Sequence, residues 1–415
     1  MGLSTFAIII FLYFFAPSTC VSWDLDAETE ALQEADRVLH IPGQPSGELS
    51  TIFSYVTADE NYGKALFYCF LRLPINPQRN PFLLWLNEDL DVLPLDLARR
   101  KSLDLFLVTF SFEKDSVVKF NNYTWKKRSD LRYLIRASNL LFLDAPAGVG
   151  FSYSNKTLDV YGDNITATDS YAFLVNWFKR FPQYKSNEFY IAGESYAGHY
   201  VPQLAEIIYD WNQKTTTKEN YINLKGFMEI RSENRLRWKF KVRPRISSLD
   251  HFWILCAKYR QVDPCSQTHA TDYFNRQDVQ EALHANVTKI SKAWELCDID
   301  INVKWNDSSF SILPIIKNSL MVVSVSGCSD LDFCFACFAW VLVRYRWRVP
   351  VTSTRYSLKK LGLNITEDWS PWYNHREVGG WTTIYEGLTF VTVRGAGHQV
   401  PTFAPKRSLQ LVKHF

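Results

Sequence analysis

The sequence predicts an α/β fold with a mostly parallel mixed central sheet and helices on both faces. Three observations support this. Short apolar segments rich in strand-favouring residues alternate along the chain with amphipathic helical patterns. The segments 82–86 and 140–143 are apolar at nearly every position, as expected of strands buried on both faces. No repeat or low-complexity linker divides residues 23–415, so we predict one large domain with insertions.

The first residues of the chain predict secretion. Residues 6–15 are apolar but too few for a comfortable membrane span, and small or neutral residues follow them. We interpret residues 1–22 as a signal peptide, although no positive charge precedes the apolar core; a buried strand or an anchor is the alternative. Six Asn-x-Ser/Thr sequons agree with a secreted glycoprotein: Asn122, Asn155, Asn164, Asn286, Asn306 and Asn364.

Composition argues against several classes of function. The chain has 46 Lys and Arg against 43 Asp and Glu, a net charge of +3, which does not suggest nucleic acid or a membrane surface as partner. Eight irregularly spaced cysteines in a secreted chain predict a few disulfides. The tight cluster of Cys328, Cys334 and Cys337 lacks a second pair of zinc ligands, so we predict no metal and no cofactor.

The remaining elements follow in chain order. We predict strands at 63–71, 81–87 and 140–143, then a Pro/Gly-rich loop at 144–153. A helix is predicted over 169–181, closed by Pro182, and another over 274–284 with Asp278 in its first turn. Further strands are predicted from residue 225, at 321–327 and at 388–393.

The most informative stretch is residues 188–211. A short predicted strand at 189–192 is followed by a turn of small residues and a helix with one apolar face. A nucleophile elbow requires this order, because the tight turn lifts the Ser195 hydroxyl clear of the sheet and points the helix N-terminus at developing negative charge. An ordinary turn that carries a serine is the alternative, and the final position of the pentapeptide is Ala197 rather than glycine.

A histidine lies in a matching position near the C-terminus. His398 is on a glycine-flanked loop just past the predicted strand 388–393. There it can act as the general base for Ser195, and the order serine, acid, histidine occurs in one group of hydrolases. A lone solvated histidine is the alternative.

Five long segments carry a family resemblance. They are GESYAGHYVPQLAE at 193–206, NLLFLDAPAGVGFSYSN at 139–155, DPCSQTHATDYFNRQDVQEALHANVT at 263–288, VPVTSTRYSLKKLGL at 349–363 and GGWTTIYEGLTFVTVRGAGHQVP at 379–401. They resemble the plant serine carboxypeptidase-like proteins, which are secreted α/β-hydrolase peptidases. The likeness covers most of 30–87, 139–228, 263–327 and 348–415.

The resemblance implies an α/β-hydrolase and a serine-type carboxypeptidase that releases C-terminal residues from peptides. It implies the catalytic residues Ser195, His398 and Asp330, with Asp332 as a close rival for the acid. The N–H of Tyr196 is expected to donate to the oxyanion. Asn87 and Glu194 match the residues that hold the substrate's free carboxylate, which favours an acidic working pH, because a carboxylate pair needs a shared proton. For Glu194 a solvated turn acid is the alternative.

Three segments depart from the family pattern. After Asn87 the family has a glycine-rich turn that supplies half of the oxyanion hole, whereas this chain has Glu88 and Asp89. Losing one such donor costs about 100- to 1000-fold in turnover. The cap insertion, about 229–262, is shortened and rewritten, and residues 333–346 resemble foreign sequence. The family cysteine that would pair with Cys297 is missing. Misassigned exon boundaries at 89–116, 229–262 and 328–346 are one hypothesis for these departures.

Two alternatives to the carboxypeptidase stay open. One is a related acyltransferase, in which an alcohol replaces water, and the other is an inactive homologue or mis-spliced product. We expect a peptide substrate, a monomer or homodimer that contacts no membrane after signal removal, and an extracellular or vacuolar location.

Overall fold

A computed structural model gives the structure of the chain. It describes residues 25–43, 51–72, 77, 80–86, 110–113, 117–120, 138–215, 220–231, 266–289, 293–295, 299–325, 339–343, 351–396, 400 and 404–414. The predicted signal peptide, the predicted cap apart from residues 229–231, and the sequon Asn122 lie outside these residues.

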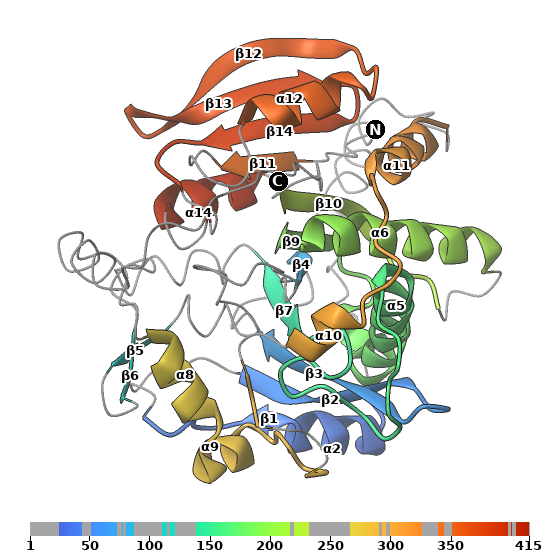
Figure 1. Ribbon diagram of the computed structural model, residues 1–415, viewed down its shortest axis with the longest axis vertical. Helices are drawn as coiled ribbons and strands as arrows, with labels where there is room; N and C mark the ends of the chain where they lie inside the picture. The colour runs from blue at the N-terminus through green and yellow to red at the C-terminus, as the bar shows by residue number, and fades with distance from the viewer. Residues whose placement is uncertain are drawn as a thin grey trace, which may run out of the picture.

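One large mixed sheet organises the described part of the chain (Figure 1). Six neighbouring strands are parallel, and antiparallel strands extend the sheet at both ends. Its order is β1 (Arg37–Val38), β2 (Thr51–Asp59), β3 (Lys64–Leu71), β7 (Asn139–Leu143), β4 (Phe82–Leu86), β9 (Phe189–Ser195), β10 (Leu224–Arg231), β11 (Ala339–Val343), β14 (Leu388–Val393), β13 (Glu377–Tyr385) and β12 (Ile365–Asn374).

The described part of the chain contains three more short strands. β8 (Tyr153–Ser154) pairs with the start of β3, and β5 (Phe110–Glu113) pairs with β6 (Val117–Phe120) in a separate two-stranded sheet. The predicted strands at 63–71, 81–87, 140–143 and 388–393 are confirmed as β3, β4, β7 and β14.

Both faces of the sheet are covered, because alternate residues of each strand point to opposite sides. On one face Leu84 of β4 packs with residues of α5 (Asp163–Arg180), α6 (Ala197–Lys214) and α11 (Leu313–Val325). On the other face Leu83 packs with residues of α8 (Ser266–Phe274), α9 (Gln277–Ala282) and α14 (Pro405–His414). All five residues of β4 are buried, as the apolar pattern predicts.

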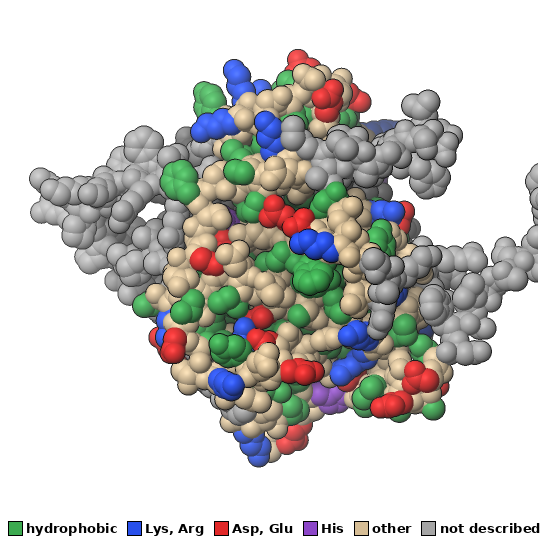
Figure 2. Space-filling model, turned by 90° about the vertical axis from the view of Figure 1, so that its right-hand side faces the viewer, with side chains coloured by type: hydrophobic (Ala, Val, Ile, Leu, Met, Phe, Trp, Pro, Cys, Tyr) green, Lys and Arg blue, Asp and Glu red, His purple; other side chains and the backbone are tan. Residues whose placement is uncertain are grey.

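The other described helical segments are short. They are α2 (Ala27–Ala35), η1 (Pro182–Tyr184), α10 (Ile299–Val303) and α12 (Val351–Lys359). Over the side of the molecule that carries α5 and α6, charged side chains of both signs are interspersed with apolar ones (Figure 2), in keeping with a net charge of only +3. Within the described helices none is long and apolar enough to span a bilayer.

The structure corrects two helix boundaries. The helix predicted over 169–181 begins at Asp163, because the apolar pattern marks only its later turns. The helix predicted over 274–284 is two helices, with Phe274 ending α8 and Gln277 beginning α9. Asp278 does lie in the first turn of α9, as predicted.

The strand predicted at 321–327 is wrong. Residues up to Val325 belong to the helix α11. A short apolar run does not distinguish a strand from a helix, and here the run of residues 320–323 belongs to a 13-residue helix that begins at Leu313. The corresponding place in the sheet, between β10 and β14, is filled by β11 from the segment 333–346 that resembled foreign sequence.

Only some of the predicted disulfide cysteines and glycosylation sites lie among the described residues. Cys69 is a buried free thiol in β3, and the other seven cysteines lie outside the described residues, so the disulfides stay a prediction. Four sequon asparagines are exposed and Asn286 is partly buried. Exposure leaves the following positions sterically open to glycosylation: Asn155, Asn164, Asn306 and Asn364.

Candidate active site

The segment around Ser195 has the backbone of a nucleophile elbow. Ser195 is the last residue of β9, a central strand between β4 and β10, and α6 begins two residues later at Ala197. The strand continues three residues beyond the predicted 189–192. The predicted strand, tight turn and helix are therefore confirmed. The side chain of Ser195 lies outside the described side chains.

Gly193 explains how the turn can be so tight. A methyl group added there would lie 2.6 Å from the Cβ of Ala197 and 3.0 Å from the carbonyl oxygen of Leu86. Real Cβ atoms do not approach other atoms so closely. The absence of a side chain at Gly193 therefore lets the first turn of α6 pack directly on β9 and β4.

Glu194 follows on the opposite face of β9, as strand alternation requires. Its side chain is 1% exposed, and its backbone is paired in register with Ile230 of β10. The alternative of a solvated turn acid is therefore wrong, because the residue belongs to a buried strand. Its role in binding a substrate carboxylate stays a prediction, as does that of Asn87, which lies outside the described residues.

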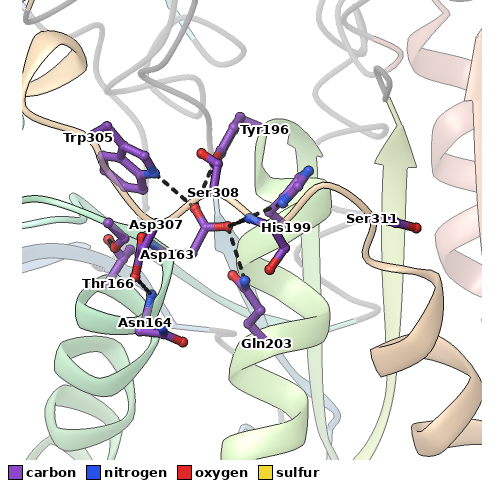
Figure 3. A network of polar contacts seen from close by, with 12 residues as sticks. Asp163, Asn164, Thr166, Tyr196, His199, Gln203, Trp305, Asp307, Ser308 and Ser311 are labelled. Atoms are coloured by element: carbon purple, nitrogen blue, oxygen red, sulfur yellow. Dashed lines mark hydrogen bonds and ion pairs between the residues drawn. The ribbon is translucent and has the colours of Figure 1, made fainter. Parts of the chain in front are cut away.

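Tyr196 occupies the single position between strand and helix, and its side chain enters a network of polar contacts (Figure 3). The Tyr196 hydroxyl donates to Oδ1 of Asp163 at 2.8 Å and also contacts the Ser308 hydroxyl. The Tyr196 ring stacks on His199, with centroids 4.7 Å apart and planes 13° apart. The backbone position expected to donate to an oxyanion thus carries a firmly held side chain.

Asp163 is the centre of this network. It lies in the first turn of α5, is 1% exposed, and receives donors from two other segments. From α6, Gln203 Nε2 donates to its carboxylate at 3.1 Å, and His199 Nδ1 lies 3.3 Å away. The segment after α10 supplies the indole N–H of Trp305 at 3.0 Å and the backbone N–H of Ser309 at 3.4 Å.

These donors set the charge of the carboxylate. Burial acts to raise the pKa of Asp163, but the hydrogen bonds from His199 and Tyr196 outweigh it, so the pKa lies below its ordinary value. Burial raises the pKa of the Tyr196 phenol well above its ordinary range, and the charge of Asp163 adds to that shift. The pair is therefore a carboxylate and a neutral phenol that donates to it.

A second aspartate fixes the network from outside. Asp307 accepts the backbone N–H groups of Asp163 and Asn164, at the start of α5. This approach depends on Gly162, because a methyl group at that position would overlap the Asp307 carboxylate. The segment around Trp305 also pairs with Tyr161 through backbone hydrogen bonds of 3.2 and 3.1 Å.

The predicted histidine and the predicted acid lie outside the described residues, and only segments that precede them in the chain are described. β14 ends at Val393, and it is parallel to β11, β10 and β9, so its carboxyl end faces the same edge of the sheet as Ser195. This agrees with His398 as base, although His398 lies outside the described residues. The strand expected to lead into Asp330 is helical, and Asp330 and Asp332 also lie outside. The role of His398 as the base and that of Asp330 or Asp332 as the acid stay predictions.

Comparison with known proteins gives this geometry a family. A family model described as serine carboxypeptidase matches residues 108–230 and 250–415. Serine carboxypeptidase-like 34 of Arabidopsis thaliana is 40% identical, and the match covers 93% of this chain and 89% of that protein. This chain belongs to the serine carboxypeptidase family. Serine carboxypeptidase-like 26 of Oryza sativa is 37% identical, with 92% of this chain and 90% of that protein covered.

The fold of a solved carboxypeptidase agrees. The prohormone-processing carboxypeptidase Kex1(ΔP) of Saccharomyces cerevisiae superposes with a TM-score of 0.70, covering 92% of this chain and 95% of that one, at 17% identity. The sheet order and the helices on both faces are therefore those of an α/β-hydrolase, as predicted. The alignment with the 40% identical relative spans 476 positions against 415 residues here, so the relative contains segments that this chain lacks.

The sequence analysis did not identify Asp163 and its partners as part of the site of this member of the serine carboxypeptidase family. One signal was available, because Tyr196, His199 and Gln203 recur at spacings of three and four and so share one face of the predicted helix. Nothing in the sequence connects that face to Asp163 or Ser308.

A further carboxyl, Asp144, lies at the same edge of the sheet, just past β7. It is buried, and only the backbone N–H of Phe151, at 3.2 Å, is described as donating to its side chain. Burial raises the pKa of Asp144 to about 8, an effect that this one hydrogen bond only partly opposes. The Pro/Gly-rich loop is thus held against a carboxyl that is neutral below about pH 8. A second contact holds the same loop, because the Ser152 hydroxyl donates to the Asp144 backbone carbonyl at 2.6 Å.

Proposed function

We propose that this chain is a serine-type carboxypeptidase that releases C-terminal residues from peptides through an acyl-enzyme on Ser195. The observation that carries the proposal is the place of Ser195, at the end of a central parallel strand and immediately before the N-terminus of α6. Membership of the serine carboxypeptidase family supports the substrate class. Kex1, a relative in fold, is described as prohormone-processing, which is also an action on peptides.

The reaction proceeds in two balanced steps. The Ser195 oxygen attacks the last peptide carbonyl while His398 takes its proton; the bond to the terminal amine then breaks, and His398 protonates that amine as it leaves. Water next attacks the acyl-enzyme, His398 accepts a proton from the water and returns it to Ser195, and the shortened peptide departs. Asp330 or Asp332 is proposed to orient the imidazole, and the Tyr196 N–H to donate to each oxyanion.

Exopeptidase specificity is assigned to Asn87 and Glu194. Glu194 can bind the substrate's carboxylate only with a shared proton, so we expect activity in acidic solution, and we propose an extracellular or vacuolar location. Glu88 and Asp89, in place of the family's glycine-rich turn, predict slow turnover, by about 100- to 1000-fold for one lost donor.

The first test is covalent labelling of the full purified chain with a fluorophosphonate. Wild type should be labelled at Ser195, and Ser195→Ala should not be labelled at all. Unlabelled wild-type enzyme should hydrolyse an N-blocked dipeptide at acidic pH, and labelling of Ser195 should abolish that hydrolysis. Absence of labelling in wild type would reject the proposal in favour of an inactive homologue. Transfer from a glucose-ester donor to an alcohol, without dipeptide hydrolysis, would instead identify an acyltransferase.

A further inference from the structure

We infer that Asp163 is a positioning residue, which holds the oxyanion-binding N–H of Tyr196 in place by binding the Tyr196 hydroxyl. The inference deepens the proposed function and rests on it, because it concerns the same oxyanion. Asp163 itself is placed away from the reacting atoms, on α5, and acts through the side chain of Tyr196.

The position of Tyr196 depends on contacts that its side chain makes with other segments of the chain. It is the one residue between β9 and α6, and its side chain makes no capping bond to its own helix. The hydroxyl instead reaches α5 through Asp163 and the segment after α10 through Ser308. Its ring is stacked on His199 and meets Trp305 edge-on, with centroids 5.9 Å apart. These contacts fix the side chain of Tyr196, and so restrain the position of its Cα and of the N–H that it carries.

The anchor is itself rigid. The Asp163 carboxylate lies at the N-terminus of α5, where the helix dipole favours a negative charge. Asp307 accepts the backbone N–H groups of that turn, and buried donors from two segments surround the carboxylate. The Trp305 indole N–H binds the same oxygen, Oδ1, that receives the Tyr196 hydroxyl, and Gln203 binds the other oxygen, Oδ2, so both oxygens of the carboxylate are fixed. A displacement of about 1 Å at a catalytic group can cost on the order of 100-fold in rate, so rigidity here affects function.

The chain contains a matched control for this arrangement. Tyr68, in the interior of β3, donates its hydroxyl to Asp36 at 3.0 Å, and Asp36 also accepts from Arg180 at 2.8 Å. This is the same chemistry, an aspartate that anchors a buried phenol with a second strong donor. The Tyr68 residue is not adjacent to the nucleophile, so loss of its hydroxyl should affect stability alone.

The experiment compares Tyr196→Phe with Tyr68→Phe in the full-length chain. Amide hydrogen exchange of the peptide spanning 193–200 should accelerate at least about 10-fold in Tyr196→Phe and stay at the wild-type rate in Tyr68→Phe. For dipeptide hydrolysis, kcat should fall about 10-fold in Tyr196→Phe with KM within about 2-fold, because the lost interaction is expressed in the transition state. Tyr68→Phe should keep both constants.

Asp163→Asn, paired with Asp36→Asn, tests the carboxylate itself. In Asp163→Asn, the amide nitrogen of the new side chain would replace the carboxylate oxygen that accepts hydrogen bonds from Gln203 and the Ser309 N–H, and a nitrogen that carries hydrogens cannot accept them. The increase in exchange at 193–200 should therefore match or exceed that of Tyr196→Phe. If Asp163→Asn does not fold, the Tyr196→Phe pair decides.

The two hypotheses fail in different ways. Exchange at 193–200 that is unchanged in Tyr196→Phe, or equally accelerated in Tyr68→Phe, overturns the positioning role whatever the activity. A fall in kcat shared equally by both phenylalanine variants also overturns it. Wild-type protein that is not labelled by the fluorophosphonate overturns the proposed function, and the exchange comparison then still decides whether Asp163 holds Tyr196.

Discussion

Asp163 and Asp144 are both buried beside the carboxyl edge of the sheet, yet their surroundings shift their pKa values in opposite directions. Asp163 lies at the start of α5, under the turn that carries Ser195, and its pKa is lowered. Asp144 follows β7, under the Pro/Gly-rich loop, and its pKa is raised to about 8. Burial opposes the charged form at both places, so burial alone does not account for the difference.

The difference lies in the donors. Asp163 accepts from a phenol, an amide, an indole and a backbone N–H, with an imidazole also in contact and a helix N-terminus behind it. The described donor to the Asp144 carboxyl is the single N–H of Phe151. A buried acid stays charged where several donors converge, and becomes neutral where one donor must offset its desolvation.

The opposite pKa shifts of Asp163 and Asp144 together limit the pH range in which the folded state is most stable. Asp163 has a folded pKa below the ordinary 3.8, so its stabilisation is present above pH 3.8 and is lost as pH falls through the folded value. Asp144 has a folded pKa of about 8, so its contribution is complete below pH 3.8 and is lost as pH rises toward 8. Together the two groups favour the folded state most near about pH 4, because Asp163 adds stability up to that pH and Asp144 loses stability above it.

The largest expected effect is that of Asp163→Ala. Removing the acceptor leaves several buried donors without a partner, and the free energy of unfolding should fall by about 3–5 kcal/mol. Denaturant unfolding at pH 5 measures the change. A loss under about 1 kcal/mol would mean that water replaces the carboxylate and that the network holds little together.

Gly150→Ala should have an intermediate effect. Gly150 has φ +55° and a methyl group there would overlap the Asp144 carboxyl, whereas Gly362 has φ +69° and open space around it. Both alanine variants carry the cost of a left-handed backbone, about 1–2 kcal/mol. Gly150→Ala should cost about 1–3 kcal/mol more, from displacement of Asp144. Equal unfolding free energies for the two variants would show that the loop adapts without disturbing Asp144.

The smallest expected effect is that of Asp144→Asn at about pH 4, where Asp144 is still partly protonated in the unfolded chain too. The neutral amide resembles the neutral acid, so unfolding free energies should differ by less than about 1 kcal/mol. As pH rises toward 8 the wild type should lose stability relative to Asp144→Asn, by at most about 1.4 kcal/mol per pH unit. Parallel stability profiles from pH 5 to 8 would show that Asp144 is already ionised.

Local pattern predicted most of the sheet and the elbow. β4, β7, β9 and β14 are short apolar runs bounded by turn residues, and Gly193 with Ala197 signals a tight strand-to-helix turn. The same reasoning was wrong at 321–327, because a short apolar run fits a helix as well as a strand, and this run belongs to the helix that begins at Leu313. It also dismissed the segment that supplies β11, whose partners are distant in sequence.

The sequence by itself determined the family, the α/β architecture and the position of Ser195 at the end of a central strand, because these depend on residue order and short-range patterns. Only the tertiary structure decided that Asp163 holds Tyr196 and that Asp144 is a neutral acid. The Tyr196 and Ser309 donors are 33 and 146 residues from Asp163 along the chain. Ionisation inside a protein depends on which groups surround a carboxyl in space, and folding brings those groups together from separate segments.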